Sequence, residues 1–169
     1  MPKKLPIAIT LEEFKKLMRN TKQKHHRVAF LLAFASGLRV SEVINLQSHD
    51  IDIKEKKILV RCGKGGKDRI VPLPKLFRKD LLNQIPIKIT PRSLQRAFKT
   101  AAKKAGILKT KPQAHFHSLR HGFATQCLRS GMDIQNVRFF MGHSNISTTS
   151  IYLHSEPKEA LGKYEELFG

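Results

Sequence analysis

The spacing of apolar positions predicts helices at the start of the chain. Thr10 and Glu13 form a capping-box pattern, and apolar residues follow it at helical spacing over 11–20. The apolar run 28–35 lies within a second predicted helix, which is too short to span a membrane and is stopped by Gly37. We expect this second helix to be buried in the core.

The apolar period changes from helical to alternating after a short predicted helix at 41–46. Alternating apolar residues then mark three short segments, separated by turns at 55–56 and 63–67. This pattern predicts a three-stranded antiparallel meander. The alternating positions are Ile51, Ile53, Ile58, Val60, Ile70 and Pro72.

Beyond the predicted sheet, the pattern is helical to the end of the chain. The clearest signal is Thr90-Pro91, a cap followed by an N1 proline, with Gly106 closing the same helix. The fold class is therefore mainly α with a small three-stranded antiparallel sheet, in a single domain. The helices predicted in this half of the chain span 75–84, 91–105, 118–129, 133–142 and 158–168.

Charge makes this helical domain a candidate nucleic-acid-binding protein. The 169-residue chain has 32 Lys and Arg residues against 13 Asp and Glu residues, a net charge of +19. The segment 81–132 contains ten basic residues and no acidic one, whereas residues from 151 onward include four Glu and two Lys. A basic body indicates a polyanionic partner such as nucleic acid. A cationic surface that serves only solubility is the alternative.

Composition also limits the compartment and the kinds of site. No stretch has the roughly 18 consecutive apolar residues of a membrane span, so we expect a soluble, cytoplasmic protein. Cys62 and Cys127 are far apart and form no CxxC pattern. The sequence therefore predicts neither a disulfide framework nor a cysteine zinc site.

Two short patterns suggest a phosphate-binding P-loop and a zinc site, and the sequence fits both sites poorly. The glycine-rich tip at 63–67 is followed by Asp68, where a P-loop has Ser or Thr. His117 and His121 stand one helical turn apart, a spacing that zinc can use. The absence of acidic residues over 81–132 argues against a hydrolytic zinc site or a two-metal nuclease. We therefore expect no metal and no cofactor.

Five short motifs, taken in chain order, closely resemble the tyrosine recombinase and integrase family, in a Xer-like form. They are Gly-Leu-Arg39-Val-Ser-Glu, Gly-Lys64-Gly, His117-Ser-Leu-Arg120-His, Met-Gly-His143, and Tyr152 nine residues later. The resemblance implies the DNA breaking-rejoining fold of that family's catalytic domain over residues 1–169. It also implies that the N-terminal core-binding domain usual in the family is absent from this sequence.

The resemblance further implies a catalytic set for cleaving a DNA phosphodiester. Its members are Arg39, Lys64, His117, Arg120, His143 and Tyr152. In this set the two arginines hold the phosphate oxygens bidentately, and the second histidine orients one of them. A neutral His117 helps the Tyr152 hydroxyl to lose its proton, and Lys64, or Lys67 on the same tip, protonates the leaving 5′ oxygen.

The expected partners are double-stranded DNA with a specific recombination site and other recombinase subunits. The predicted last helix, 158–168, resembles a segment that relatives dock on a neighbouring subunit, and packing on its own domain is the alternative. A type IB topoisomerase-like enzyme and a non-catalytic DNA-binding regulator are the alternative functions. The residues expected to contact DNA outside the catalytic set are Lys67, Arg69, Arg92, Arg96 and Lys99.

Overall fold

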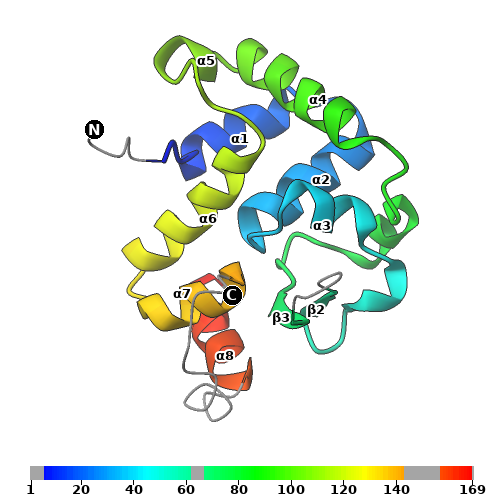
Figure 1. The fold of residues 1–169 in the computed structure, drawn as a ribbon, viewed down its shortest axis with the longest axis vertical. Coiled ribbons are helices and arrows are strands. Elements are labelled where there is room, and N and C mark those ends of the chain that lie inside the picture. The colour runs from blue at the N-terminus through cyan, green and yellow to red at the C-terminus, as the bar shows by residue number, and fades with distance from the viewer. Residues whose placement is uncertain (1–5, 62–66, 143–156, 169) are drawn as a thin grey trace.

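Helices make up most of the fold in the computed structural model, which describes residues 6–61, 67–142 and 157–168 (Figure 1). None of the described helices is long and apolar enough to cross a membrane. The α-helices are α1 (Leu11–Arg19), α2 (Lys24–Ala35), α3 (Val40–Asn45), α4 (Pro91–Lys104), α5 (Ile107–Thr110), α6 (His117–Arg129), α7 (Ile134–Met141) and α8 (Pro157–Phe168). The strands are β1 (Ile51–Asp52), β2 (Lys57–Val60) and β3 (Arg69–Pro72), and the 3-10 helices are η1 (Ser48–Asp50) and η2 (Lys79–Gln84).

Helix α2 lies in the middle of the molecule, as the sequence predicts. Every residue over 28–34 is buried, because this helix is apolar on all sides and is covered from several directions. The ring of Phe30 meets Phe98 of α4 edge-on, with a centroid distance of 5.9 Å. Figure 1 shows α4 and α5 at one end of the molecule and α7 and α8 at the other. The central helix therefore connects the two ends.

The predicted meander is confirmed as an antiparallel sheet with strand order β1-β2-β3. Ile58 of β2 pairs with both Ile51 and Val71, so these residues lie side by side across the sheet. All three are buried, which places this face of the sheet on the core.

The helix predicted over 75–84 is wrong in kind and extent, because the structure has only the 3-10 helix η2 there. The adjacent residues Leu76 and Phe77 are 71% and 4% exposed, so one is in solvent and the other is in the core. Such a pair reflects a turn after Pro74 and not the face of a long helix. The short helix α5 was not predicted, because Gly106 has a left-handed backbone (φ 75°) that ends α4 and lets a new turn begin at once.

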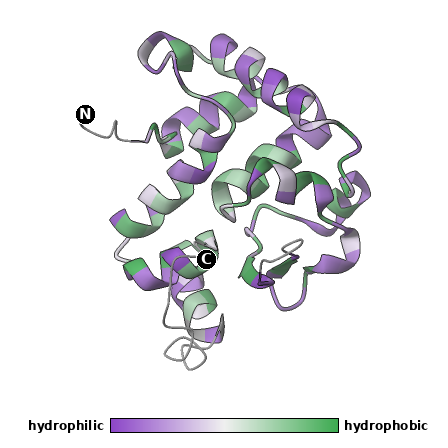
Figure 2. Cartoon of the chain, viewed as in Figure 1, coloured by the Kyte–Doolittle hydropathy of each residue, from purple (hydrophilic) through white to green (hydrophobic). Residues whose placement is uncertain are grey.

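Helix α8 packs on its own domain. The Tyr164 hydroxyl donates a hydrogen bond to the carbonyl oxygen of Ala35 at 2.8 Å, and its ring centroid lies 6.4 Å from that of Phe123. Tyr164 is therefore a packing residue, and it is 8% exposed. Figure 2 shows hydrophilic residues along α4, in contrast to the more hydrophobic α2.

The closest approach of α6 to its neighbours occurs at Gly122. We predict that Gly122→Ala lowers the free energy of unfolding by about 1–3 kcal/mol, because of overpacking. An added Cβ would lie 2.4 Å from the carbonyl oxygen of Ile9 and 2.8 Å from the ring of Phe34.

Gly162→Ala in α8 is the matched control, because nothing lies within 4 Å of its added Cβ. Alanine in a helix interior stabilises by about 0.5–1 kcal/mol relative to glycine. Urea unfolding of both variants measures the two effects. A Gly122→Ala protein as stable as the wild type would contradict the tight contact of α6.

Candidate active site

Three arginine side chains converge on the carboxyl end of α7. Arg69 donates from Nε to the carbonyl oxygen of Phe140 at 2.8 Å, and Arg120 donates from Nη2 to that of Met141. Arg39 approaches the same Met141 oxygen from Nη2 at 3.4 Å. The last carbonyls of a helix lack intrahelical partners and form its negative end, so cations are favoured there. Helix α7 thereby gathers guanidinium groups from three different elements.

The carboxylate of Glu42 lies among these arginines and is 9% exposed. Arg69 binds it bidentately, with Nη1 and Nη2 at 2.8 and 2.9 Å from the two oxygens. Arg39 donates to it from Nη1 at 2.9 Å and from its backbone N–H at 2.7 Å, and Arg120 Nη1 lies 3.8 Å away. Burial favours the neutral acid, but the hydrogen bonds from Arg69 and the Arg39 backbone lower the Glu42 pKa to about 2. Glu42 is therefore ionised at neutral pH.

Arg120 is the most deeply buried of the three arginines, at 1% exposure. Its Nη1 donates to the carbonyl oxygen of Gly37 and its Nη2 to that of Met141, while its Nε has no hydrogen-bond partner among the described residues. Burial, followed by repulsion from Arg39, lowers the Arg120 pKa to about 9, so the side chain is still charged at neutral pH. A buried, charged donor without a partner indicates a site that an anion completes.

His117 begins α6 beside this cluster and is half-buried. Its ring lies edge-on to that of His121, at a centroid distance of 4.8 Å. Burial, then the charges of His121 and Arg120, lower its pKa to about 4. The imidazole is thus neutral at neutral pH and can accept a proton. Within 6–61, 67–142 and 157–168, no group of three or more His, Cys, Asp or Glu side chains is arranged to hold a metal ion.

The structure describes three of the six predicted catalytic residues and places these three close together. Arg39, His117 and Arg120 lie close enough for their charges to act on one another. The remaining predicted catalytic residues lie outside the described residues and stay predictions; they are Lys64, His143 and Tyr152.

Two further residues, Lys67 and Arg69, flank the hairpin tip and differ in exposure. Lys67 is exposed, whereas the Arg69 side chain is only 5% exposed and is bound to Glu42. The contacts of Arg69 therefore give it a structural role within the site. A direct contact between Arg69 and DNA stays a prediction.

A second basic surface lies on α4. Arg92, Arg96 and Lys99 recur at spacings of four and three, so they share one exposed face of the helix. Together with Gln95 and Thr100 they line a shallow hollow of about 530 Å³. The opposite face of α4 packs in the core, which fixes the direction in which these cations point.

Glu42 was not predicted as a site residue, although a signal for it exists in the sequence. It stands three residues after Arg39, the spacing at which a glutamate side chain reaches back to the backbone N–H at the start of a helix. Its ion pair with Arg69 joins residues 27 apart in sequence. No local pattern reports a contact of that separation.

The described residues form a helical domain with a small antiparallel sheet and a cluster of buried arginines. The chain belongs to the phage integrase family, whose sequence model matches residues 8–88 and 81–159. The tyrosine recombinase XerA of Thermococcus kodakarensis is 38% identical over an alignment of 172 positions. The alignment covers 90% of this chain and 59% of that protein.

Solved structures agree with this assignment. The integrase from mycobacterium phage Brujita superposes with a TM-score of 0.80 at 25% identity, covering 99% of this chain and 60% of that one. A crystal structure of XerA recombinase superposes with a TM-score of 0.70 at 28% identity, covering 98% and 66%. The chain spans about three fifths of the length of the curated relatives that it matches.

The buried ionisable groups predict a loss of stability in acid. The pKa of Glu42 is about 2 when folded and 4.5 ordinarily, so its stabilisation is present above pH 4.5 and is lost as the pH falls toward 2. The pKa of His117 is about 4 when folded and 6.5 ordinarily, so the unfolded chain takes up the proton first and stability falls between pH 6.5 and 4.

Urea unfolding midpoints measured across this pH range test the assignment. We expect His117→Asn to flatten the curve between pH 6.5 and 4, and Glu42→Gln to flatten it below pH 4.5. Each variant serves as the control for the other, because the two act in different pH windows. An unchanged slope in His117→Asn would show that this histidine does not carry the lowered pKa.

Proposed function

We propose that this chain is the catalytic domain of a site-specific tyrosine recombinase, which cleaves and rejoins DNA through a covalent 3′-phosphotyrosine intermediate. The observation that carries the proposal is the arginine cluster. Three positive charges and one carboxylate leave a net charge of +2 around Glu42, with a buried Arg120 Nε that lacks a described partner. A phosphodiester supplies both the missing charge and the missing acceptor.

The two arginines Arg39 and Arg120 are suited to different parts of this task. The Arg39 side chain is 37% exposed and is anchored at one end by Glu42, so it can reach a ligand from outside. Arg120 is held by hydrogen bonds from its two Nη atoms to the carbonyl oxygens of Gly37 and Met141. Preorganised donors of this kind stabilise charge that develops on phosphate oxygens during attack. The arginine pair therefore provides the positive charge that the transition state needs.

The reaction that we propose moves protons between Tyr152, His117, Lys64 and the 5′ oxygen. The Tyr152 oxygen forms a bond to phosphorus, the bond from phosphorus to the 5′ oxygen breaks, and His117 takes the tyrosine proton. Lys64, or Lys67 in its place, gives a proton to the leaving 5′ oxygen, and His143 orients a phosphate oxygen. A 5′ hydroxyl of another strand then attacks the phosphotyrosine and gives its proton to Lys64, the bond from phosphorus to the Tyr152 oxygen breaks, and His117 returns its proton to that oxygen, so rejoining needs no ATP. The assignments of Tyr152, Lys64 and His143 follow from the family resemblance.

The proposed substrate is double-stranded DNA carrying a specific recombination site, and we infer that the protein acts on it in the cytoplasm. The net charge of +19 supports a polyanionic substrate. The basic face of α4 is the surface that we expect to contact the backbone outside the catalytic centre. Membership of the phage integrase family favours a recombinase over the topoisomerase-like and non-catalytic alternatives.

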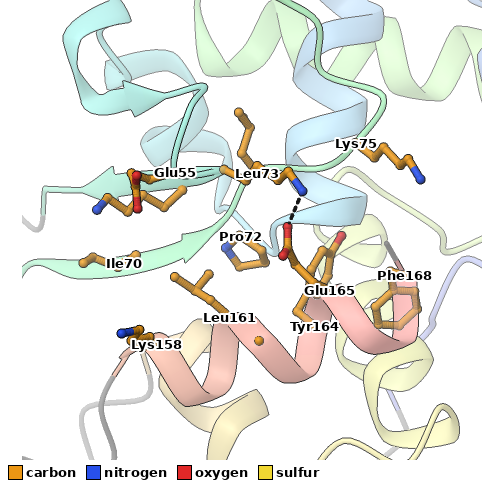
Figure 3. A pocket seen from close by; sticks show the side chains of 13 residues that line it. Glu55, Ile70, Pro72, Leu73, Lys75, Lys158, Leu161, Tyr164, Glu165 and Phe168 are labelled. Carbon is orange, nitrogen blue, oxygen red and sulfur yellow. Dashed lines mark ion pairs between the residues drawn. The ribbon is translucent and has the colours of Figure 1, made fainter.

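We further propose that other recombinase subunits on the DNA are partners and that α8 forms the contact. Helix α8 lies beside β3, as Figure 3 shows. Residues of the helix and of the sheet line a hollow of about 670 Å³. An ion pair between Lys56 and Glu165, 2.7 Å apart, crosses this hollow, but the two side chains are 60% and 49% exposed. Exposed pairs contribute little, so α8 is held mainly by Tyr164 and its apolar neighbours. Incomplete packing supports an exchange of this helix between subunits.

Covalent capture tests the catalytic proposal. We expect the wild-type chain, incubated with supercoiled plasmid or a nicked duplex in EDTA and quenched with detergent, to give protein covalently bound to DNA. Tyr152→Phe should abolish the adduct, because the nucleophilic oxygen is removed.

Tyr164→Phe is the matched control for this experiment. It also removes a tyrosine hydroxyl, but one that donates to Ala35 inside the fold, so the adduct should remain. An adduct that persists in Tyr152→Phe would exclude this residue as the nucleophile. No adduct from the wild type on a nicked substrate would contradict the enzyme.

The α4 surface makes a separate, quantitative prediction for DNA binding. We expect the double variant Arg92→Gln, Arg96→Gln to reduce the slope of log affinity against log salt by about 1.8, because each phosphate contact contributes about 0.9. The double variant Lys158→Gln, Lys163→Gln removes two exposed cations from α8 and should leave the slope unchanged. Fluorescence anisotropy with a labelled duplex at several salt concentrations measures both. Equal slopes in all three proteins would exclude α4 as a DNA contact.

A further inference from the structure

Arg69 is placed where the β2–β3 hairpin meets the arginine cluster. It is the first residue of β3 and follows the hairpin tip at 62–66 closely in sequence. Its guanidinium is buried and uses its donors in two directions. The Nη atoms bind both oxygens of Glu42 at 2.8 and 2.9 Å, and Nε donates to the carbonyl oxygen of Phe140 at 2.8 Å. One side chain therefore ties the hairpin strand to α3 and to the end of α7.

The contact with α7 extends to the residue that ends the helix. Gly142 has a left-handed backbone (φ 57°), and an added Cβ there would lie 3.0–3.1 Å from Cδ, Nε and Cζ of Arg69. The guanidinium group thus lies directly against the glycine backbone, and the chain leaves α7 at this contact. A different side chain at 69 would therefore change the support of the end of α7.

Charge explains why an arginine is needed at this position. Without Arg69, the buried Glu42 carboxylate would be balanced only by Arg39 and Arg120, which lie 2.9 and 3.8 Å from its oxygens. Both would then be drawn toward the carboxylate, because an unpaired buried charge is unfavourable. The two arginines that we assign to the phosphate would be occupied by an internal anion. Arg69 instead gives one hydrogen bond to each carboxylate oxygen, beside the two that Arg39 donates.

We propose that Arg69 is a positioning residue for the reaction: it neutralises Glu42 so that Arg39 and Arg120 stay available to the DNA phosphate. This inference rests on the proposed recombinase function and deepens it. It gives Arg69 no contact with the reacting atoms. Its effect passes through Glu42, so removing the Glu42 charge should relieve the loss of Arg69.

The test is a double-variant cycle on the rate of covalent adduct formation with a nicked duplex. We expect Arg69→Met to slow the reaction by about 10- to 100-fold, the range in which small displacements of catalytic groups act. The double variant Arg69→Met, Glu42→Gln should be at least about tenfold faster than Arg69→Met alone. Glutamine keeps an oxygen for the Arg39 backbone N–H but removes the charge. A residue that only stabilises the fold predicts the opposite, a double variant as slow as or slower than the single one.

Two further variants keep the test decisive. Arg69→Lys keeps the charge but loses the bidentate fork, so this variant should react more slowly than the wild type. Glu42→Gln should also rescue Arg69→Lys. If Arg69→Met does not fold, Arg69→Lys takes its place in the double-variant cycle. Arg78→Met is the matched control, because this arginine is 77% exposed and pairs with Asp80 at the surface. Circular dichroism melting curves identify the variants that are folded at the assay temperature.

The outcomes separate this inference from the proposed function. If the wild type forms an adduct and Arg69→Met reacts at the wild-type rate, the positioning role is overturned and the recombinase stands. If Arg69→Met is slow and Glu42→Gln gives no rescue, Arg69 supports the fold and not the charge balance. If the wild type forms no adduct on the nicked duplex, the proposed function fails and the positioning role fails with it.

Discussion

The ion pair between Arg69 and Glu42 is the interaction on which the rest of the site depends. A carboxylate with 9% exposure is stable as an anion only when its oxygens are fully bonded, and the bidentate arginine meets most of that requirement. The same carboxylate holds the Arg39 backbone at the start of α3, while the same arginine holds the end of α7. Three segments far apart in sequence are thereby fixed around one buried charge.

Packing around α2 determines where Arg39 and Arg120, the two arginines proposed to bind phosphate, are placed. At the end of α2, Gly37 has a left-handed backbone (φ 70°), and an added Cβ would lie 2.6 Å from the ring of Phe123 in α6. The chain therefore turns against α6 and enters α3 at Arg39. Arg120, one turn before Phe123 on α6, donates to the carbonyl oxygen of Gly37 itself. The core contact of two helices thus places the two guanidinium groups beside each other.

The parts of the fold that the sequence predicts are those determined by neighbours in sequence. The capping box at Thr10 and the proline at the start of α4 act within a few residues, and these two helices are confirmed. The alternation in the strands predicted the sheet, but in β3 the residue that pairs with Ile58 on the core face is Val71 and not Ile70. The region 75–84 could not be predicted, because Phe77 is drawn into the core by contacts outside its own segment. Motif spacing identified Arg39, His117 and Arg120, whereas the partnership of Glu42 with Arg69 depends on how distant segments meet.

The charge balance of the cluster also explains why its stability and its proposed function oppose each other. Replacing Arg39 or Arg120 by an apolar residue would remove the repulsion between the two side chains, and replacing Arg120 would also remove a buried donor without a described partner. The repulsion and the unpaired donor each reduce the stability of the folded state. The same features are what a phosphodiester uses, because donors that are already desolvated and aimed need no reorganisation when charge develops. A second carboxylate in the cluster would relieve the repulsion but would compete with the phosphate for the same guanidinium groups. A single glutamate bound mainly by a third arginine is the arrangement that keeps the cluster folded and leaves the other two arginines for the substrate.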